Sequence, residues 1–598
     1  MRSRGQAEGP ALAVLGLIMV AGLVLRVLHN DHGLPYVYYV DEGSHFTKRA
    51  VEVFRDANPG YFQNPSAYTY LLHLVYRVVA LPIGGGEAII DGYDDNAEWI
   101  FEISRGLAAV LCLVGVGAVY LVGRRLWNRR TGLVAAAVLC FAFLPVAFSR
   151  VAVTDVGTLA PVALVLLFAV RIHENGRLVD CAAAGAIAGL AIGFKYTAGL
   201  VLLAPALALA LRLVAHRALR AALLGGLALA AGTVITFSIT NPYFFLDFDF
   251  ALNQLHGQAE RAGSEVKFGQ ERETGALYYL ESLLWGLGYV ATAFAAAGAV
   301  LLARRTHSSP SAARSTGTHS SPSAARSTGT HASPSAARST SDRTTLALLM
   351  IFPVALFLYL SVQSRFFGRW LLPLYPVLAL LAGYGLVRAV EAVRVRAPRL
   401  ERPALAAGCA LLLWQPLAAD ARSLAVLGHR DTRAIAREWL ADNYPRELRI
   451  VIEPEVPERY HWPVRAGRPE RLKRPQFVNE LVRAIRATHV EYGRALRPWM
   501  LDRYRREGYC LVMTFDLIRG RAEAAGDRTA LAYYEALDRE SDIVYEVSPY
   551  RADAEGPSFS FDLSYSYYSP AYVRPGPEVR IHRLRDCRPQ YGPREPSA

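Results

Sequence analysis

The sequence predicts a polytopic α-helical membrane protein with a C-terminal soluble α/β domain. Of its 598 residues, 53% are hydrophobic, and the mean hydropathy is +0.19. A soluble protein of this length is more polar. Many apolar segments approach the length that crosses a bilayer, and they stop at Ala419. Beyond that residue the chain is rich in Arg, Glu and Tyr. Together, these observations predict a membrane domain followed by a soluble one.

Eleven segments approach or reach the length of about 20 residues that spans a bilayer as a helix. They are Ala11–Leu28, Gly106–Gly123, Thr131–Phe148, Val156–Arg171, Val179–Phe194, Thr197–Leu211, Leu219–Thr240, Leu284–Ala303, Thr345–Val362, Trp370–Val390 and Pro403–Ala419. Several are rich in Ala and Gly, which allow membrane helices to pack closely. We therefore predict about 11 transmembrane helices within residues 11–419, the first being a retained span rather than a cleaved signal peptide.

Basic residues predict the orientation of these helices. With the N-terminus in the cytoplasm, five basic loops lie on the cytoplasmic side, as Lys and Arg prefer. These loops are Gly123–Arg130, Arg171–Arg177, Arg212–Arg220, Ala303–Arg305 and Arg388–Arg402. The assignment requires that Tyr68–Ile83 does not cross, and this segment is short and carries His73 and Arg77. We predict that it is a juxtamembrane or re-entrant helix in a first outer loop, residues 30–100. If it crossed, the charge rule would fail.

A 12-residue repeat interrupts the membrane domain. "THSSPSAARSTG" occurs twice from Thr306, and a variant of it ends at Ser341. Such a polar tract cannot bury a core. The sequence therefore predicts a disordered cytoplasmic loop at residues 304–344.

The region 430–598 is predicted to be an extracytoplasmic α/β domain. A helix is expected at Asp431–Pro445 from its apolar spacing. The predicted strands are Leu448–Glu453, Tyr509–Phe515, Asp542–Ser548 and Glu578–Leu584. Cys510 and Cys587 fall in this region, where an oxidising compartment would permit a disulfide. The sequence leaves open whether they pair.

Charged residues also gather in the predicted outer loops. The acids are Asp41, Glu42 and Asp155, and the basic residues are Arg150, Lys195, Arg365 and Arg369. Lys and Arg usually favour cytoplasmic loops, so basic residues in short outer loops need an explanation. One is that their side chains extend along the apolar surface to reach water. A lipid phosphate at the outer surface would explain them. Because the charge of +13 is distributed over loops in this way, we expect membrane lipids as partners and no nucleic acid.

The order of six motifs resembles that of the GT-C glycosyltransferases, which use polyprenyl-phosphate-linked sugars. The motifs are "VDEGSHFTKRA", "NPSAYTYLL", "FSRVAVTDV", "GLAIGFKYTAGLVLLAP", "RFFGRWLLPLYPVLALLAGYGL" and "RPGPEVRIHRL". They are most similar to the dolichyl-phosphate-mannose–protein mannosyltransferase and bacterial aminoarabinose transferase type. The resemblance covers roughly residues 11–390, and the repeat loop departs from it.

The resemblance implies a GT-C-like fold and an activity. A sugar would move from a polyprenyl-phosphate donor to a hydroxyl of a protein, a cell-wall glycan or a glycolipid. The reaction would invert the sugar and take place on the outer face of a bacterial-type plasma membrane.

The resemblance also implies site residues. Asp41 would be the general base, and Glu42 would orient it, bind sugar or help to hold a metal. Asp155 would contact sugar or acceptor. The predicted substrate-binding residues are Arg150, Lys195, Tyr196, Arg365 and Arg369, with the cations stabilising the phosphate. The alternative for Asp41-Glu42 is an N-cap of a helix at Gly43–Phe54.

No cofactor is required by this reading, but a divalent metal stays open. Asp247 and Asp249 form a D-x-D motif, and His45 and His256 are further ligand types. The alternative functions are a polytopic transporter or lipid flippase with an extracytoplasmic domain, and a structural or sensory membrane protein. A transporter predicts charges within spans and repeated spans, which the sequence does not favour.

Overall fold

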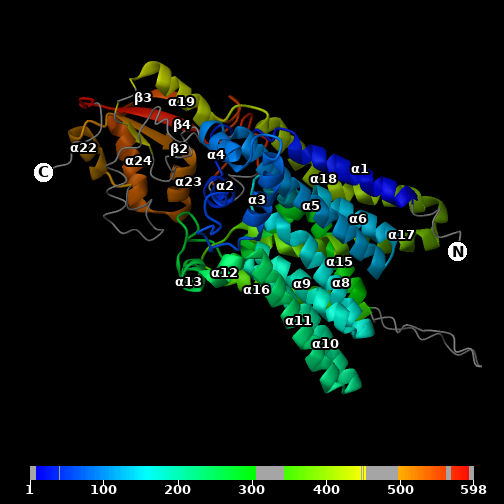
Figure 1. Ribbon diagram of the computed structural model, residues 1–598. Helices are drawn as coiled ribbons and strands as arrows, with labels where there is room; N and C mark the ends of the chain where they lie inside the picture. Colours follow the sequence, from blue (N-terminus) through cyan, green and yellow to red (C-terminus); the bar gives the residue numbers. More distant parts are fainter. Residues whose placement is uncertain are drawn as a thin grey trace, which may run out of the picture.

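The computed structural model describes residues 9–39, 41–304, 342–445, 448, 450–452, 496–560 and 567–590. A long bundle of helices occupies one part of the molecule, and a small sheet with its helices lies at one end of that bundle (Figure 1). The repeat loop predicted at residues 304–344 falls almost entirely outside the described residues.

Eight helical segments of the described chain are long and apolar enough to cross a membrane. They are Gly9–Val27 (α1), Glu98–Leu126 (α5), Asp155–Asn175 (η2 and α8), Tyr196–His216 (η3 and α10), Leu219–Thr240 (α11), Asp342–Ser361 (α16), Gly368–Arg396 (η4 and α17) and Pro398–Asn443 (η5, α18 and α19). A ninth results if α14 (Gly275–Leu287) and α15 (Tyr289–Arg304), which are bent by 107°, form one span.

Nine of the eleven predicted segments thus meet this criterion in the described chain if the bent pair counts as one span, and the other two do not. The segment predicted at Val179–Phe194 is α9 (Leu178–Phe194), which is apolar but has only 17 residues. The segment predicted at Thr131–Phe148 divides into α6 (Arg129–Phe141) and α7 (Phe143–Phe148). Extended backbone at Ala142 separates them, so neither part reaches the length of a span.

The first loop contains short helices, as predicted. They are η1 (Glu42–Phe46), α2 (Thr47–Glu52), α3 (Ala67–Ala80) and α4 (Gly86–Asp95). One face of α3 buries Tyr68, Leu72 and Tyr76, whereas Leu74 and Val78 are exposed. An amphipathic helix of 14 residues suits a position along the membrane surface rather than across it.

Small residues allow the helices of the bundle to approach closely. α9 and α11 meet at Gly185 and Gly232. A Cβ on Gly185 would lie 2.0 Å from the Leu229 carbonyl oxygen, and one on Gly232 would lie 2.5 Å from the Ala182 carbonyl oxygen. Larger residues at these two positions would force the helices apart, which explains the Ala- and Gly-rich composition.

The C-terminal region forms a four-stranded sheet. Its strands are β1 (Ile450–Ile452), β2 (Leu511–Phe515), β3 (Ser541–Val547) and β4 (Val579–Leu584), in the order β1-β2-β4-β3. β1 and β2 are parallel, and the other pairs are antiparallel. All four predicted strands are confirmed, because each was marked by a run of Val, Ile, Leu or aromatic residues.

Helices α19 (Thr432–Asn443), α22 (Trp499–Arg506), α23 (Asp516–Ala525) and α24 (Arg528–Glu540) accompany the sheet. The helix predicted from Asp431 is α19. Asp431 is its N-cap, and its carboxylate accepts a hydrogen bond from the Arg433 backbone N–H.

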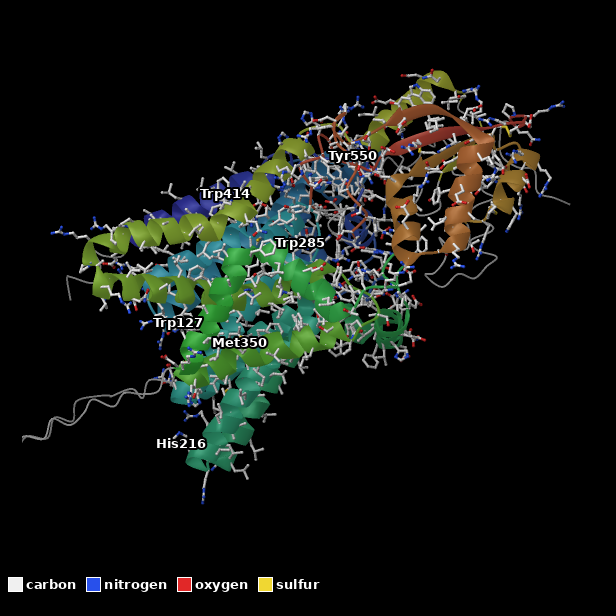
Figure 2. All side chains as sticks on the ribbon, turned by 180° about the vertical axis from the view of Figure 1, so that it is seen from behind. Trp127, His216, Trp285, Met350, Trp414 and Tyr550 are labelled. Carbon is white, nitrogen blue, oxygen red and sulfur yellow. A yellow bond between two sulfur atoms is a disulfide. The ribbon has the colours of Figure 1, made fainter. Side chains whose placement is uncertain are left out.

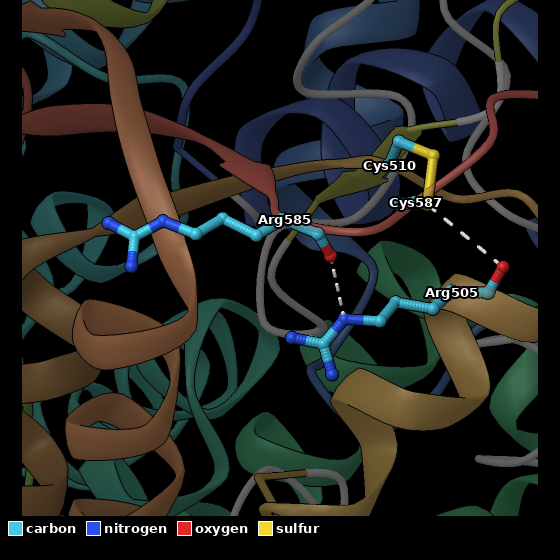
Figure 3. Close-up of a disulfide and its surroundings, with 4 residues drawn as sticks. All are labelled: Arg505, Cys510, Arg585 and Cys587. Carbon is cyan, nitrogen blue, oxygen red and sulfur yellow. Dashed lines mark hydrogen bonds between the residues drawn. A yellow bond between two sulfur atoms is a disulfide. The ribbon is translucent and has the colours of Figure 1, made fainter.

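Cys510 and Cys587 form a disulfide, which answers the question that the sequence left open (Figure 3). Cys510 precedes β2 and Cys587 follows β4, and these two strands are neighbours in the sheet. Their Cα atoms are 5.4 Å apart. Nearby, the Arg505 guanidinium donates to the Arg585 carbonyl oxygen over 3.1 Å, which further joins α22 to the end of β4.

The basic loops gather at the end of the bundle that lies away from the sheet. Trp127 and His216 mark this end in Figure 2, and Tyr550 marks the end beside the sheet. Ion pairs join helix ends there. Arg125 of α5 lies 3.5 Å from Glu174 of α8, and Arg130 of α6 pairs with Glu401 of α18. Three of the five basic loops, Gly123–Arg130, Arg171–Arg177 and Arg388–Arg402, are thus joined at this end.

Candidate active site

Four charged side chains converge at the opposite end of the bundle. Arg369 Nη2 lies 2.7 Å from Asp41 Oδ2, and Arg369 Nε lies 3.9 Å from Asp155 Oδ2. Lys195 Nζ donates to the other oxygen of Asp155. We call Asp41, Asp155, Lys195 and Arg369 the charge cluster. The sequence predicted all four as site residues, although they are separated by up to 328 positions.

The cluster has a closed side and a more open side. The side chains of Asp155 and Lys195 are 5% and 9% exposed, whereas those of Asp41 and Arg369 are 24% and 17% exposed. Buried charges are tolerated when they are paired, as these are. Asp41 is therefore the carboxylate of the cluster that a substrate can reach most readily.

Local backbone geometry positions three of these residues at the starts of spans. Asp155 begins the 3₁₀ helix η2 (Asp155–Thr158), and Lys195 caps η3 (Tyr196–Leu202) in an extended conformation. Arg369 is the second residue of η4 (Gly368–Leu374). Each 3₁₀ turn continues into a long α-helix, so the charges stand on rigid elements at the end of the bundle.

Asp41 does not act as a helix cap. It precedes η1 with a helical backbone, and its side chain makes no capping hydrogen bond. Its carboxylate instead faces Arg369, while His45 Nε2 lies 3.9 Å from Oδ1. The His45 ring stacks on Tyr61 at 4.5 Å, and the Tyr39 hydroxyl accepts a hydrogen bond from Arg369. The capping alternative is therefore wrong for this side chain.

The surroundings of Asp41 favour its ionised form. Burial raises the pKa of this carboxyl, but Arg369 outweighs burial with help from His45, Lys267 and Lys195, and the pKa lies below its ordinary value. For Lys195, burial lowers the pKa of the amine with help from Arg369, Asp155 and Asp41 oppose this change, and the pKa lies below its ordinary value. The cluster thus holds an ionised carboxylate among several cations.

Glu42 has a different environment from its neighbour. Its side chain is fully buried, and Arg105 of α5 donates to both carboxylate oxygens, over 2.7 and 3.0 Å. The Ala152 backbone N–H also donates to it, and Arg105 further binds the Asn30 carbonyl oxygen. Glu42 therefore ties the first loop to α5 and to the segment before Asp155. This geometry suits a structural tie rather than the catalytic or metal-binding role that the sequence suggested.

Arg150 also lies apart from the charge cluster. Its guanidinium donates to the Leu25 carbonyl oxygen and to Ser423 Oγ, each over 2.9 Å. These contacts join the ends of α1 and α18 to the segment after α7. A packing role between helix ends fits this buried side chain better than the predicted contact with substrate.

Tyr196 and Arg365 border the site without joining the cluster. The Tyr196 hydroxyl donates to the Phe62 carbonyl oxygen over 3.0 Å. Arg365 Nη2 lies 2.7 Å from Glu265 Oε2. Their predicted roles in substrate binding stay predictions. Arg365 pairs with Glu265, which is outside the charge cluster, whereas Arg369 pairs with Asp41 inside it.

Sequence reasoning missed Arg105 and Lys267. Arg105 lies within a helix next to the apolar segment Gly106–Gly123, and only its contacts with Glu42 explain it. Lys267 lies between the predicted spans Leu219–Thr240 and Leu284–Ala303, where nothing in the sequence linked it to Asp41.

Metal ligands are not grouped in the described part of the chain. No set of three or more His, Cys, Asp or Glu residues there has a geometry that could hold a metal ion. Asp247 of the D-x-D motif accepts a hydrogen bond from Asn58 Nδ2 over 3.0 Å. A metal requirement therefore stays an open prediction, with no ligand set assigned.

Comparison with known proteins identifies the fold. Residues 102–240 match the family model for dolichyl-phosphate-mannose-protein mannosyltransferase. The archaeal oligosaccharyltransferase AglB from Archaeoglobus fulgidus, solved with an inhibitory peptide and a dolichol-phosphate, is 11% identical. The alignment covers 91% of this chain and 74% of that one, with a TM-score of 0.52.

ArnT from Cupriavidus metallidurans, solved with undecaprenyl phosphate, is 15% identical over 91% of this chain and 96% of its own, with a TM-score of 0.47. No curated protein matches the sequence. The chain thus shares its fold with GT-C glycosyltransferases, as its motifs indicated, and residues 102–240 match one of their families. Its long apolar helices make it an integral membrane protein.

Proposed function

We propose that this chain is a membrane glycosyltransferase that moves a sugar from a polyprenyl-phosphate donor to a hydroxyl acceptor, with Asp41 as the general base. The observation that carries the proposal is the charge cluster. It holds an ionised carboxylate beside Arg369, with a second carboxylate and Lys195 behind it. Transfer from a phosphate-linked sugar needs a carboxylate as general base and cations that stabilise the leaving phosphate, and the cluster holds both.

The chemistry follows from these positions. Asp41 accepts the proton of the acceptor hydroxyl while the hydroxyl oxygen attacks the anomeric carbon. The bond between that carbon and the phosphate oxygen breaks, and the lipid phosphate leaves with the electron pair. Arg369 and Lys195 stabilise its charge. Attack opposite the leaving group inverts the anomeric carbon.

Asp155 has a supporting part in this scheme. It contacts both cations of the cluster, and so holds them near Asp41 before the donor arrives. A direct contact with sugar or acceptor, as the resemblance implied, is compatible with this position.

Several observations support the class of donor and the side of the membrane. The AglB structure contains a dolichol-phosphate and an inhibitory peptide, so the same fold can bind a lipid phosphate and a peptide together. The disulfide Cys510–Cys587 suits an oxidising compartment. The basic helix ends lie at the far end of the bundle, which suits the cytoplasmic side. We therefore assign the site and the C-terminal domain to the outer face of a bacterial-type plasma membrane.

The orientation can be tested with single cysteines. Ser558→Cys introduces a thiol in the C-terminal domain, and Arg399→Cys introduces one in η5 (Pro398–Leu400), among the basic loops. An impermeant thiol reagent should label the first in intact cells and the second only after lysis. The reverse pattern would place the site in the cytoplasm.

The activity itself is tested with purified protein in lipid nanodiscs and a panel of polyprenyl-phosphate sugars labelled in the sugar. We expect one donor to release its lipid phosphate while the label moves to a hydroxyl acceptor, or slowly to water. Asp41→Asn is the matched control and should abolish release. Movement of intact donor between leaflets, with no cleavage of any donor, would instead establish a flippase.

A further inference from the structure

The loop between α13 (Phe248–Ser264) and α14 joins the charge cluster to the C-terminal domain. Phe268 of this loop is 2% exposed and belongs to the hydrophobic core that the sheet builds with α19, α22, α23 and α24. It thus comes from the membrane domain but is buried in the other domain. A buried Phe is a strong anchor, because its truncation commonly costs about 3–5 kcal/mol.

The residues around Phe268 follow α23 closely. Gly269 has a φ of +96°, and a Cβ there would lie 3.1 Å from the Arg521 side chain. Gly526, the C-cap of α23, lies against the Arg272 guanidinium. The loop therefore docks along one helix of the C-terminal domain at several points.

The same loop and the end of α13 also form hydrogen bonds with the segment that carries Arg369. Gln270 is buried, and its side chain donates to the Phe366 carbonyl oxygen over 2.9 Å and accepts from the Phe366 N–H over 3.2 Å. The Ser364 N–H donates to the Ala262 carbonyl oxygen over 2.8 Å. These bonds fix the backbone only a few residues before Arg369.

Phe367 completes the connection to Asp41. Lys267 Nζ and the Arg369 guanidinium each lie 4.8 Å from the centre of its ring. Such cation–π contacts hold a cation in place without neutralising it. The positions of Lys267 and Arg369 are thus linked through one ring, and both charges act on Asp41.

We propose that the C-terminal domain positions the charge cluster, with Phe268 as the anchor and Lys267 as a further residue that attracts the lipid phosphate. Phe268 is a positioning residue that acts through Lys267 and Arg369. The positioning is independent of the reaction, whereas the role of Lys267 toward phosphate rests on the proposed function.

Hydrogen exchange of the full-length protein tests the positioning without any substrate. In Phe268→Ala, exchange should accelerate at the amides of residues 364–367 and 269–271. Leu537→Ala is the matched control, because Leu537 of α24 is fully buried in the same core but outside the loop. It should loosen the sheet and leave residues 364–367 protected. Equal protection of these residues in wild type and Phe268→Ala would overturn the positioning.

Binding of undecaprenyl phosphate in nanodiscs tests the role of Lys267. Loss of one charge-assisted contact should weaken binding about tenfold in Lys267→Met. Phe268→Ala should weaken it by a similar factor, and Phe268→Leu should restore most of it. In the double variant Lys267→Met/Phe268→Ala, the two losses of affinity should not multiply, because the Phe268 change alone already displaces Lys267.

The hydrogen-exchange and lipid-binding experiments together distinguish failure of the positioning from failure of the proposed function. Multiplying losses, or normal binding by Phe268→Ala, would contradict the link between anchor and cation. If wild-type protein does not bind undecaprenyl phosphate at all, the proposed function and the role of Lys267 fail together, while the exchange experiment still decides the positioning.

Discussion

The two ends of the membrane bundle use the same charged residue types in opposite ways. At the end away from the sheet, Arg125 and Glu174 form a pair between helix ends, and the Arg125 side chain is 58% exposed. At the other end, Arg369 contacts Asp41 and approaches Asp155, and all three are largely buried. One end has separate pairs in contact with solvent, and the other has a shared, enclosed cluster.

The two kinds of charge pair differ in what they contribute to the stability of the fold. Exposed pairs contribute little, since solvent screens them and their side chains lose freedom. Enclosed clusters are costly to assemble unless every charge has a partner. A cluster that keeps a carboxylate ionised beside cations is therefore best explained by function, and the following changes can break or sharpen that contrast.

Asp41→Asn should have the largest effect. It keeps the shape of the side chain and removes the proton acceptor, so transfer should fall ~100- to 10,000-fold, or about 3–5 kcal/mol of barrier. The protein should still fold and bind undecaprenyl phosphate, as measured in nanodiscs, because Arg369 is retained. Turnover within about threefold of wild type would mean that Asp41 is not the base.

Glu42→Gln should damage stability rather than chemistry. It leaves the Arg105 guanidinium buried without its counter-charge, which typically costs about 3–5 kcal/mol. Thermal unfolding in detergent should show the loss, and the protein that remains folded should keep most of its turnover. The double variant Glu42→Gln/Arg105→Met should recover part of the stability. A folded but inactive Glu42→Gln protein would return Glu42 to the catalytic group.

Arg369→Ala should weaken binding of undecaprenyl phosphate by about ten- to a hundredfold, and Arg369→Lys should recover only part, because Lys lacks the planar fork. Its pH profile should also change. Arg369 holds the pKa of Asp41 below its ordinary value, so the wild-type base stays ionised as pH falls. Without Arg369, burial dominates, the pKa of Asp41 rises, and the acidic limb of kcat/KM should move to higher pH.

Arg365→Ala serves as the matched control for Arg369. Arg365 pairs with Glu265 rather than with Asp41, so its loss should change binding less and leave the acidic limb in place. An equal shift of the limb in both variants would show that the two arginines act on Asp41 alike.

Arg125→Ala at the opposite end should have the smallest effect. The pair with Glu174 is largely exposed on the Arg125 side, so its loss should cost about 0–1 kcal/mol of unfolding free energy and leave turnover unchanged. Thermal unfolding and the transfer assay check both parts. A large loss of activity would remove the distinction between the two ends.

Much of the architecture follows from local sequence. Runs of apolar residues predicted the membrane helices, and runs of Val, Ile and Leu predicted all four strands. These features depend on neighbours a few positions apart, so hydrophobic periodicity is enough to find them. The count of spans was less secure, because length alone does not show that Ala142 divides one apolar run into α6 and α7.

The site was determined differently. The sequence indicated that Asp41, Asp155, Lys195 and Arg369 lie at helix ends of one side, because sidedness follows from charge and span order. Only the tertiary structure decided that Arg369 meets Asp41, whereas Arg150 goes to Ser423. Arg150 and Arg369 are alike as residues. Their partners come from helices far apart in sequence, and close packing rather than residue type selects which ones meet.

The neighbours Asp41 and Glu42 show the same limit most simply. The sequence by itself determined that a pair of carboxylates follows the first span. The tertiary structure decided that one faces Arg369 near the surface and the other is buried against Arg105. Successive side chains of a helical turn point about 100° apart, so the bundle encloses one of them and leaves the other open to a substrate.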